Sequence, residues 1–182
     1  MKPEFILTEN LRFIPKDPMA LKKYIDELKD RAKSTQDISE QVSLHGEIGV
    51  YLRSLGLFEE AQAVLQNVIK VIEKNKLGVR KEIQNKIRLA HVFQEAKQFQ
   101  QSNHLFSEVI KTCRSIEEAF PLLHFALQHA GKNEFDQEKY ATALENFEEA
   151  LSLRLSVEAP LDQIESTQAA IARTKQLMEY KV

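Results

Sequence analysis

Five histidines are the residues of this chain best suited to acid–base chemistry or to binding a metal ion. They are His45, His91, His104, His124 and His129. His124 and His129 are five positions apart, about 140° around a helix, so they cannot share a metal as an i, i+4 pair can. The sequence contains no HExxH, GxGxxG or GxxxxGK[ST] motif. We therefore expect no metal ion and no cofactor.

The other candidates for chemistry are one cysteine and the paired acidic residues. Cys113 is the only cysteine, so no disulfide and no thiolate metal site can form within the chain. It falls at the end of a predicted helix with no histidine near it in sequence, which favours a buried, unreactive thiol over a nucleophile. Glu59-Glu60 and Glu148-Glu149 are most simply solvated helix faces. With no catalytic constellation, we expect that the chain is not an enzyme.

Length and composition are those of an ordinary soluble domain. The chain has 182 residues, of which 43% are hydrophobic and 29% are charged, and its net charge is −2. That charge gives no reason to expect nucleic acid as a partner. The longest apolar run, residues 119–127, is interrupted by Pro121 and His124 and is far shorter than the roughly 20 residues that a membrane span needs. The N-terminus lacks a signal-peptide pattern, so we expect a cytoplasmic protein that does not bind membranes.

Helix-breaking residues are few. The long stretches between the five glycines and five prolines are rich in Glu, Gln, Lys, Leu and Ala, which favours helix throughout. Asp17 and Pro18 predict the start of the first helix, and Gly56 suits the end of the second. Ser115–Glu118 has the pattern of a capping box for the sixth helix, and Pro121 then kinks that helix or delays its start. The expected helices span about 18–34, 37–55, 58–75, 79–96, 99–113, 115–136, 139–157 and 160–180.

Residues 1–16 form an extended, apolar N-terminal arm. Pro3 and Pro15 disfavour helix there, and the segment between them includes Phe5, Ile6 and Phe13. Such apolar side chains are unusual in a free tail. We expect the arm to pack along its own domain, and the alternative is that it docks on another chain.

A period of 41 residues organises most of the chain. Each unit places a small residue late in one helix and a second small residue 12 positions further on, beyond a short turn. Small side chains at both places let two antiparallel helices approach closely, while larger residues fill the space around them. One helix pair cannot bury both of its faces, so pairs must stack as in a solenoid. The repeated positions are Gly49, Ala90 and Gly131 (first small residue), Phe58, Phe99 and Tyr140 (aromatic), Ala61, Ser102 and Ala143 (second small residue), and Leu65, Phe106 and Phe147 (core).

At these positions the sequence resembles the tetratricopeptide repeat family. The third unit resembles it most, with Gly131, Tyr140, Ala143 and Phe147, and the second is looser because Lys97 replaces the turn glycine. The usual period of the family is about 34 residues, and 41 indicates the variety with longer helices. The resemblance covers about residues 17–180. It implies an all-α fold, a right-handed α-solenoid of antiparallel helix pairs with about eight helices.

The repeat extends beyond its three full units. Residues 37–76, 79–114 and 116–157 are full repeats, whereas 17–35 reads as a second helix without its partner and 160–180 as a first helix without its partner. We expect these half repeats to be capping helices with polar outer faces. The alternative is that the C-terminal half repeat of one chain stacks on the N-terminal half repeat of another, which gives a ring or a filament.

The resemblance implies a concave groove, lined by the first helix of each pair, that holds a peptide or a partner helix. The groove would carry a basic ladder of His91, Lys132 and Arg173 that favours an acidic partner segment, unless Ile87 and Phe125 are simply core residues. The family's carboxylate clamp is absent, which argues against a role as a chaperone co-adaptor. The expected partner-binding residues are Val50, Arg53, Gln84, Ile87, His91, Gln94, Phe125, Gln128, Lys132, Phe135 and Arg173.

The sequence thus predicts a non-catalytic protein–protein interaction module, a scaffold or adaptor that binds another protein or peptide. The alternative is a self-associating scaffold, a homo-oligomer assembled through the complementary half repeats.

Overall fold

The computed structural model describes residues 3–179, in which eight α-helices, one 3-10 helix and two short strands form the regular structure. The chain divides into two compact units, Met1–Gln98 and Phe99–Val182. The boundary falls between the two helices of the second expected repeat. Each unit is described by itself.

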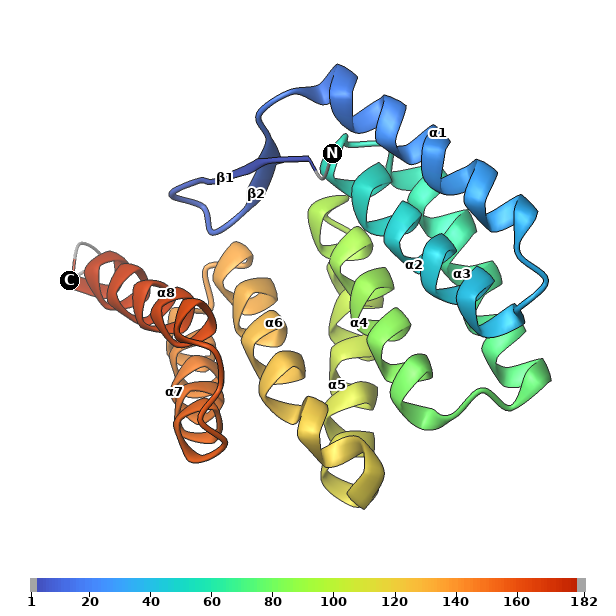
Figure 1. Cartoon of the computed structure of the whole chain (residues 1–182). Coiled ribbons are helices and arrows are strands. Elements are labelled where there is room, and N and C mark those ends of the chain that lie inside the picture. Colours follow the sequence, from blue (N-terminus) through green and yellow to red (C-terminus); the bar gives the residue numbers. More distant parts are fainter. Residues whose placement is uncertain (1–2, 180–182) are drawn as a thin grey trace. The chain divides into compact units, whose positions relative to one another are not determined.

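The first unit begins with an antiparallel hairpin and continues with four helices. The strands are β1 (Phe5–Leu7) and β2 (Phe13–Pro15), and Ile6 pairs with Ile14. The extended arm therefore folds back on itself. Consecutive helices of this unit pack against one another, and Figure 1 shows α1 and α2 side by side, with the hairpin near the start of α1. The four helices are α1 (Pro18–Ser34), α2 (Ile38–Ser54), α3 (Phe58–Asn75) and α4 (Val79–Glu95).

The second unit has the same succession of helices with one irregular start. Helix α6 packs against α5 on one side and α7 on the other, and α8 packs against α7. Figure 1 shows α7 and α8 lying side by side. The expected end of the last helix at Tyr180 lies outside the described residues. The elements are α5 (Phe99–Ser115), the 3-10 helix η1 (Glu117–Leu122), α6 (Leu123–Asp136), α7 (Tyr140–Ser156) and α8 (Leu161–Glu179).

The predicted start of α1 and the predicted end of α2 are confirmed. The Asp17 carboxylate accepts hydrogen bonds from the backbone N–H groups of Met19 and Ala20, as an N-cap does. Gly56 follows α2 with a positive φ of 75°, and the Leu57 N–H donates to the Leu52 carbonyl. Together these bonds make the left-handed helix end that glycine permits.

The same turn recurs at the period of 41 residues without glycine. Lys97 and Glu138 take φ values of 59° and 60° at the positions equivalent to Gly56. The next N–H again bonds to a carbonyl five residues back, from Gln98 to Phe93 and from Lys139 to Glu134. The turn geometry therefore follows the packing of the helices and not the residue type.

The capping box predicted at Ser115 is wrong. Ser115 is the last residue of α5, and its hydroxyl donates back to the Lys111 carbonyl instead of capping a new helix. Residues 117–122 form a 3-10 helix that contains Pro121, and α6 starts only at Leu123. Of the two outcomes expected from Pro121, the later start is the one that occurs.

Glycine provides the close approach of helices in both units. A Cβ added to Gly49 would lie 2.6 Å from the Leu65 side chain, and one added to Gly131 would lie 2.6 Å from the Phe147 ring. Leu65 and Phe147 are fully buried. The expected close packing is thus confirmed, with one refinement: the large core residue, and not the second small residue, fills the space over each glycine.

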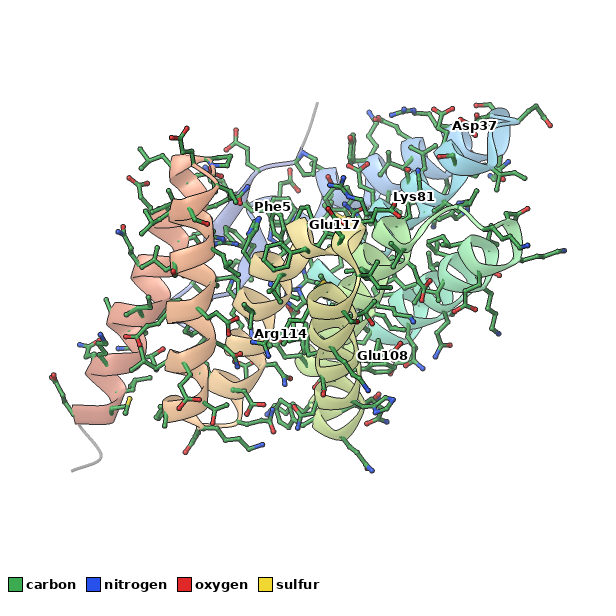
Figure 2. All side chains as sticks on the ribbon, turned by 90° about the horizontal axis from the view of Figure 1, so that it is seen from below. Phe5, Asp37, Lys81, Glu108, Arg114 and Glu117 are labelled. Atoms are coloured by element: carbon green, nitrogen blue, oxygen red, sulfur yellow. The ribbon has the colours of Figure 1, made fainter. Side chains whose placement is uncertain are left out.

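Helices α2 and α4 lie parallel, and their contacts follow the repeat. Lys81 donates to the Ser39 hydroxyl at 2.6 Å, and Arg53 pairs with Glu95. Both contacts join residues 42 positions apart. Figure 2 shows Lys81 and Asp37 at the same end of the two helices. The first helices of the first two repeats are therefore in register, offset by one residue from the period.

These observations define the fold class as all-α, with adjacent helices packed in pairs in an α-solenoid arrangement. The terminal helices differ from the others at the small-residue positions. Ala61 and Gly131 are buried, whereas Ala20 in α1 and Ala172 in α8, which occupy equivalent positions, are exposed. Their exposed surroundings are largely charged or polar, which is what capping helices require.

Candidate functional site

The hairpin packs on the first unit through aromatic side chains. The Phe5 ring stacks on the Tyr51 ring of α2, with centroids 6.1 Å apart, and the Tyr24 ring of α1 meets Tyr51 edge-on at 5.6 Å. Leu11, between the strands, is buried. Figure 2 labels Phe5 on the hairpin. The arm therefore packs along its own domain, as the first of the two expectations stated.

The hairpin is also held by charge. Glu95 near the end of α4 pairs with Arg53 of α2, and its other oxygen lies 3.8 Å from Arg12 between the strands. The side chains of Glu95 and Arg53 are only about 15% exposed. Because one carboxylate serves two guanidinium groups, this cluster joins the hairpin, α2 and α4.

A second arginine crosses from α4 to α2 further along. A Cβ on Gly46 would clash with the Arg88 guanidinium, so only glycine lets Arg88 lie against α2 at this point. Arg88 also donates to the Asn85 side chain. Burial lowers the pKa of Arg88, and the nearby Glu47 carboxylate opposes that effect. We refer to Val50, Arg53, Gln84, Arg88 and Glu95 together as the α2/α4 face.

The predicted partner-binding residues of the first unit differ in exposure. Gln84 is exposed, Val50 and His91 are half-buried, and Arg53 is engaged by Glu95. Ile87 and Gln94 are buried, with 7% and 5% of their surface exposed. Among the expected contacts of this unit, Gln84 therefore has the most accessible side chain. Ile87 is a core residue, which is the alternative that the sequence left open for it.

The predicted partner-binding residues of the second unit are less accessible. Gln128 and Phe135 are buried, and Phe135 meets the Tyr140 ring edge-on at 5.5 Å. Lys132 and Arg173 are half-buried, and Arg173 donates to the Gln176 side chain. The basic ladder is divided between the units, with His91 in the first and Lys132 and Arg173 in the second.

Phe125 belongs to a cluster around Arg154, which is buried although no carboxylate pairs with it among residues 3–179. The Arg154 guanidinium lies 5.7 Å from the Phe125 ring centroid, and its Nε donates to His124 Nδ1 at 3.3 Å. It also donates to the Gln163 carbonyl at 2.7 Å and to the Thr167 hydroxyl of α8. One side chain of α7 therefore holds both α6 and α8.

Burial shapes the pKa values of this cluster. Burial, reinforced by the Arg154 charge, lowers the pKa of His124 to about 4, so that the imidazole is neutral and its Nδ1 accepts a hydrogen bond from the Arg154 Nε–H. Burial likewise lowers the pKa of Arg154, and Asp162 opposes that effect. The Arg154 guanidinium and the His124 imidazole thus satisfy each other's hydrogen-bonding groups inside the unit, which is a structural role.

The cysteine and the candidate metal ligands of the sequence can now be placed. Cys113 is fully buried, and burial raises the pKa of its thiol to about 11, so the reactive thiolate is disfavoured. Between residues 3 and 179, no three His, Cys, Asp or Glu side chains gather in a way that could hold a metal ion. Over the same range, no helix has the length and apolar character needed to cross a membrane.

A cleft of about 570 Å³ lies in the second unit between α5 and α7, with α6 beneath it. Its apolar lining, which we call the floor, is formed by Phe106 and Ile110 of α5 and by Leu127 and Ala130 of α6, and its other lining residues are polar or charged. At one end the Arg114 guanidinium of α5 makes two hydrogen bonds, of 2.9 and 2.8 Å, to the Glu149 carboxylate of α7. Figure 2 labels Arg114 on α5. We call this site the α5–α7 cleft.

An amide network forms the opposite end of the cleft. Ser102 donates to Asn133 at 2.6 Å, Asn133 donates to Asn103, and Gln137 donates to Asn103 at 2.8 Å. Lys139 donates to Gln137 in turn. This network explains why a serine replaces alanine in the second repeat: its hydroxyl links α5 to α6.

The sequence interpretation missed the residues of the cleft. Lys111, Arg114 and Asn146 lie on second helices, whereas the resemblance pointed to the first helices of each pair. Their spacing carries no motif, since they come from two helices whose separation only the structure gives. Arg88 was missed for a similar reason, because its position depends on Gly46.

Comparisons with known proteins support the fold. No family model matches the chain, and no curated sequence matches it significantly. Among solved structures, BtubC (BKLC) from P. vanneervenii is similar, with a TM-score of 0.61 over 91% of this chain and 75% of that chain. The sequence identity is 14%, so the likeness concerns the fold alone. The chain is thus similar in fold to BtubC. Any proposal about its function must be argued from its own residues.

Proposed function

We propose that this chain is a non-catalytic interaction module that binds a segment of a partner protein on the α2/α4 face. The observation that carries the proposal is the docking of the chain's own hairpin. One end of the face already holds an extended, apolar segment through a ring stack on Tyr51 and the paired charges of Arg12, Arg53 and Glu95. A surface that holds such a segment in cis has the chemistry to hold another in trans.

The other end of the face is where a partner has most room. Gln84 is exposed there, and the Arg88 guanidinium is half-buried on the same side of α4. A cation that is partly desolvated favours an acidic group, in keeping with the acidic partner that the sequence predicts. The tetratricopeptide resemblance supports the same use of first helices.

The test measures the affinity of the chain for one purified partner, because capture alone would not show where that partner binds. The intact chain is immobilised, bound proteins are identified, and one of them is purified for titration calorimetry. Gln84→Glu should weaken binding by about 1 kcal/mol or more, because it places a like charge where an acidic segment is expected. The melting temperature should not change, since Gln84 is exposed.

The matched control is Gln66→Glu, which makes the same chemical change at an exposed position of α3. It should leave the affinity unaltered. Equal effects of the two substitutions, or no effect of Gln84→Glu on any purified partner, would contradict binding on the α2/α4 face.

Self-association is the second candidate, and the exposed small residues of the terminal helices favour it. Ala20 and Ala172 occupy positions at which the full repeats bury a small residue. A helix pair formed between two chains would cover both. The charged residues around Ala20, which include Lys23 and Glu27, weigh against this candidate.

Light scattering across a wide range of concentrations decides between the two candidates. A self-associating chain should gain mass as concentration rises, and Ala172→Glu should abolish that gain by placing a charge in the contact. A constant monomeric mass would rule out the self-associating scaffold and leave the interaction module in place.

A further inference from the structure

The α5–α7 cleft is a concave site that lies within the second unit and that the proposed function does not use. Its volume of about 570 Å³ falls in the range of sites that bind small ligands or side chains of a partner. The floor is formed by apolar groups, among them Phe106 and the half-buried Ile110. A ligand that fits must therefore bring an apolar group to this floor.

The walls of the cleft specify the rest of the ligand. Lys111 is exposed on α5 and pairs with no carboxylate among residues 3–179, and Arg114 lies one turn further along. Glu134, the acidic residue among those that line the cleft, lies 3.5 Å from the Lys139 ammonium group. Glu149 offsets the charge of Arg114, so Lys111 leaves a net positive charge at the α5 end of the cleft, which is complementary to an acidic group.

Arg114 already binds a carboxylate group of the chain itself. Glu149 reaches across from α7 and gives it a bidentate carboxylate contact. Both side chains are exposed, at 54% and 43%, so this ion pair is weak and open to exchange. An incoming carboxylate can replace Glu149 and gain Lys111 as a second cation.

An amide side chain faces the same space. Asn146 of α7 lines the cleft and is half-buried. An asparagine amide has both donors and an acceptor, so it can pair with the N–H and C=O groups of a peptide backbone. This feature favours a peptide over a simple organic acid.

We propose that the α5–α7 cleft binds a peptide segment that carries an apolar side chain next to an acidic one. The apolar side chain lies on the floor beside Ile110, the carboxylate replaces Glu149 at Arg114, and Asn146 pairs with the backbone. This inference rests on the proposed function, since it names a second surface for a protein partner. It differs in position, because the cleft lies in the second unit and the α2/α4 face in the first.

The test uses two probes that differ only in charge. N-acetyl-leucyl-glutamate amide and N-acetyl-leucyl-glutamine amide are titrated into the intact, isotope-labelled chain and followed by NMR. The acidic probe should shift the signals of Lys111, Arg114 and Asn146 in a saturable way. It should bind about twofold to fivefold more tightly than the neutral probe, the range expected for exposed ion pairs.

Substitutions of opposite effect sharpen the test. Lys111→Gln should weaken binding of the acidic probe, whereas Glu149→Gln should strengthen it by freeing Arg114. The side chains of both residues are exposed, so neither change should unfold the chain, and a thermal melt of each variant checks this. Equal binding of the two probes, no saturable shift at the cleft, or weaker binding in Glu149→Gln overturns the proposal.

Failure of the cleft can be told apart from failure of the proposed function. A purified partner whose affinity falls with Gln84→Glu but not with Lys111→Gln leaves the interaction module standing and overturns the cleft as its peptide site. If no partner is found but the acidic probe binds at the cleft, the cleft proposal stands and the interaction module on the α2/α4 face is overturned.

Discussion

The Phe147 ring fills the space that the absent side chain of Gly131 leaves between α6 and α7. Two ring carbons lie 2.6 and 2.7 Å from the point where a Cβ would be, far inside van der Waals contact. Leu65 stands in the same relation to Gly49 in the first unit. The glycine and the large residue 16 positions later therefore act as one packing unit.

Gly131→Ala should lower the free energy of unfolding by about 1–3 kcal/mol, because the new methyl group must displace a fully buried ring. Urea denaturation of the intact chain measures this change. The matched control is Ala172→Leu at the equivalent position of α8, which is exposed and should alter stability by less than about 0.5 kcal/mol. Similar losses in the two variants would show that overpacking is not the cause.

Lys97→Gly should stabilise the chain by up to about 1 kcal/mol, because Lys97 holds a positive φ that costs a side chain more than it costs glycine. Gly56→Ala, at the equivalent turn, should destabilise by a similar amount although its Cβ would meet no neighbour. The two substitutions should change stability in opposite directions, because a positive φ costs a residue with a side chain more than it costs glycine. Thermal unfolding of both variants checks them, and shifts of the same sign would contradict that reason.

Stability should decrease on acidification through the range in which His124 titrates. Its pKa is 6.5 in the unfolded chain and about 4 in the folded one, so between these values the unfolded state binds more protons. The contribution is fully present above pH 6.5 and is lost as pH falls toward 4. Urea midpoints at near-neutral and at mildly acidic pH should therefore differ.

His124→Asn is the control for that pH dependence. Its side-chain oxygen can accept the Arg154 hydrogen bond but does not titrate. The difference between the two midpoints should be smaller in this variant. An unchanged difference would mean that other groups cause the pH dependence.

Glu95→Gln should loosen the hairpin without unfolding the helices. The change removes the charge that Arg12 and Arg53 share, so exchange of the β1 and β2 amide protons should become faster. Hydrogen–deuterium exchange read by mass spectrometry measures it, with α3 as the internal reference. Lys16→Gln, which removes only the exposed pair with Glu4, should have a smaller effect. Equal acceleration in α3 would indicate global destabilisation instead.

Much of the fold could be predicted because its signals are local and recur. The spacing of Gly49, Ala61 and Leu65 is enough to predict a helix pair, and its return 41 and 82 positions later predicts stacked pairs. The prediction at Ser115 was wrong because a capping box and the last turn of a helix use the same residue types. Only the contact of its hydroxyl with the Lys111 carbonyl distinguishes them.

The candidate sites were less predictable because they depend on distances between helices. Nothing in the local sequence indicates that Arg88 crosses to Gly46 or that Arg154 binds both neighbouring helices. The cleft follows from the gap between α5 and α7, which Arg114 and Glu149 bridge from positions 35 apart. The resemblance implies a groove lined by first helices, whereas Lys111, Arg114 and Asn146 of the cleft lie on second helices.

The Arg154 cluster determines how the C-terminal helix can be studied. Deleting α8 removes the Gln163 carbonyl and the Thr167 hydroxyl, and it leaves a buried cation with too few acceptors. A shortened chain would then lose solubility or structure whether or not α8 ever meets another molecule. Single changes on the outer surface of α8, at Ala172 for example, separate these two causes where truncation confounds them.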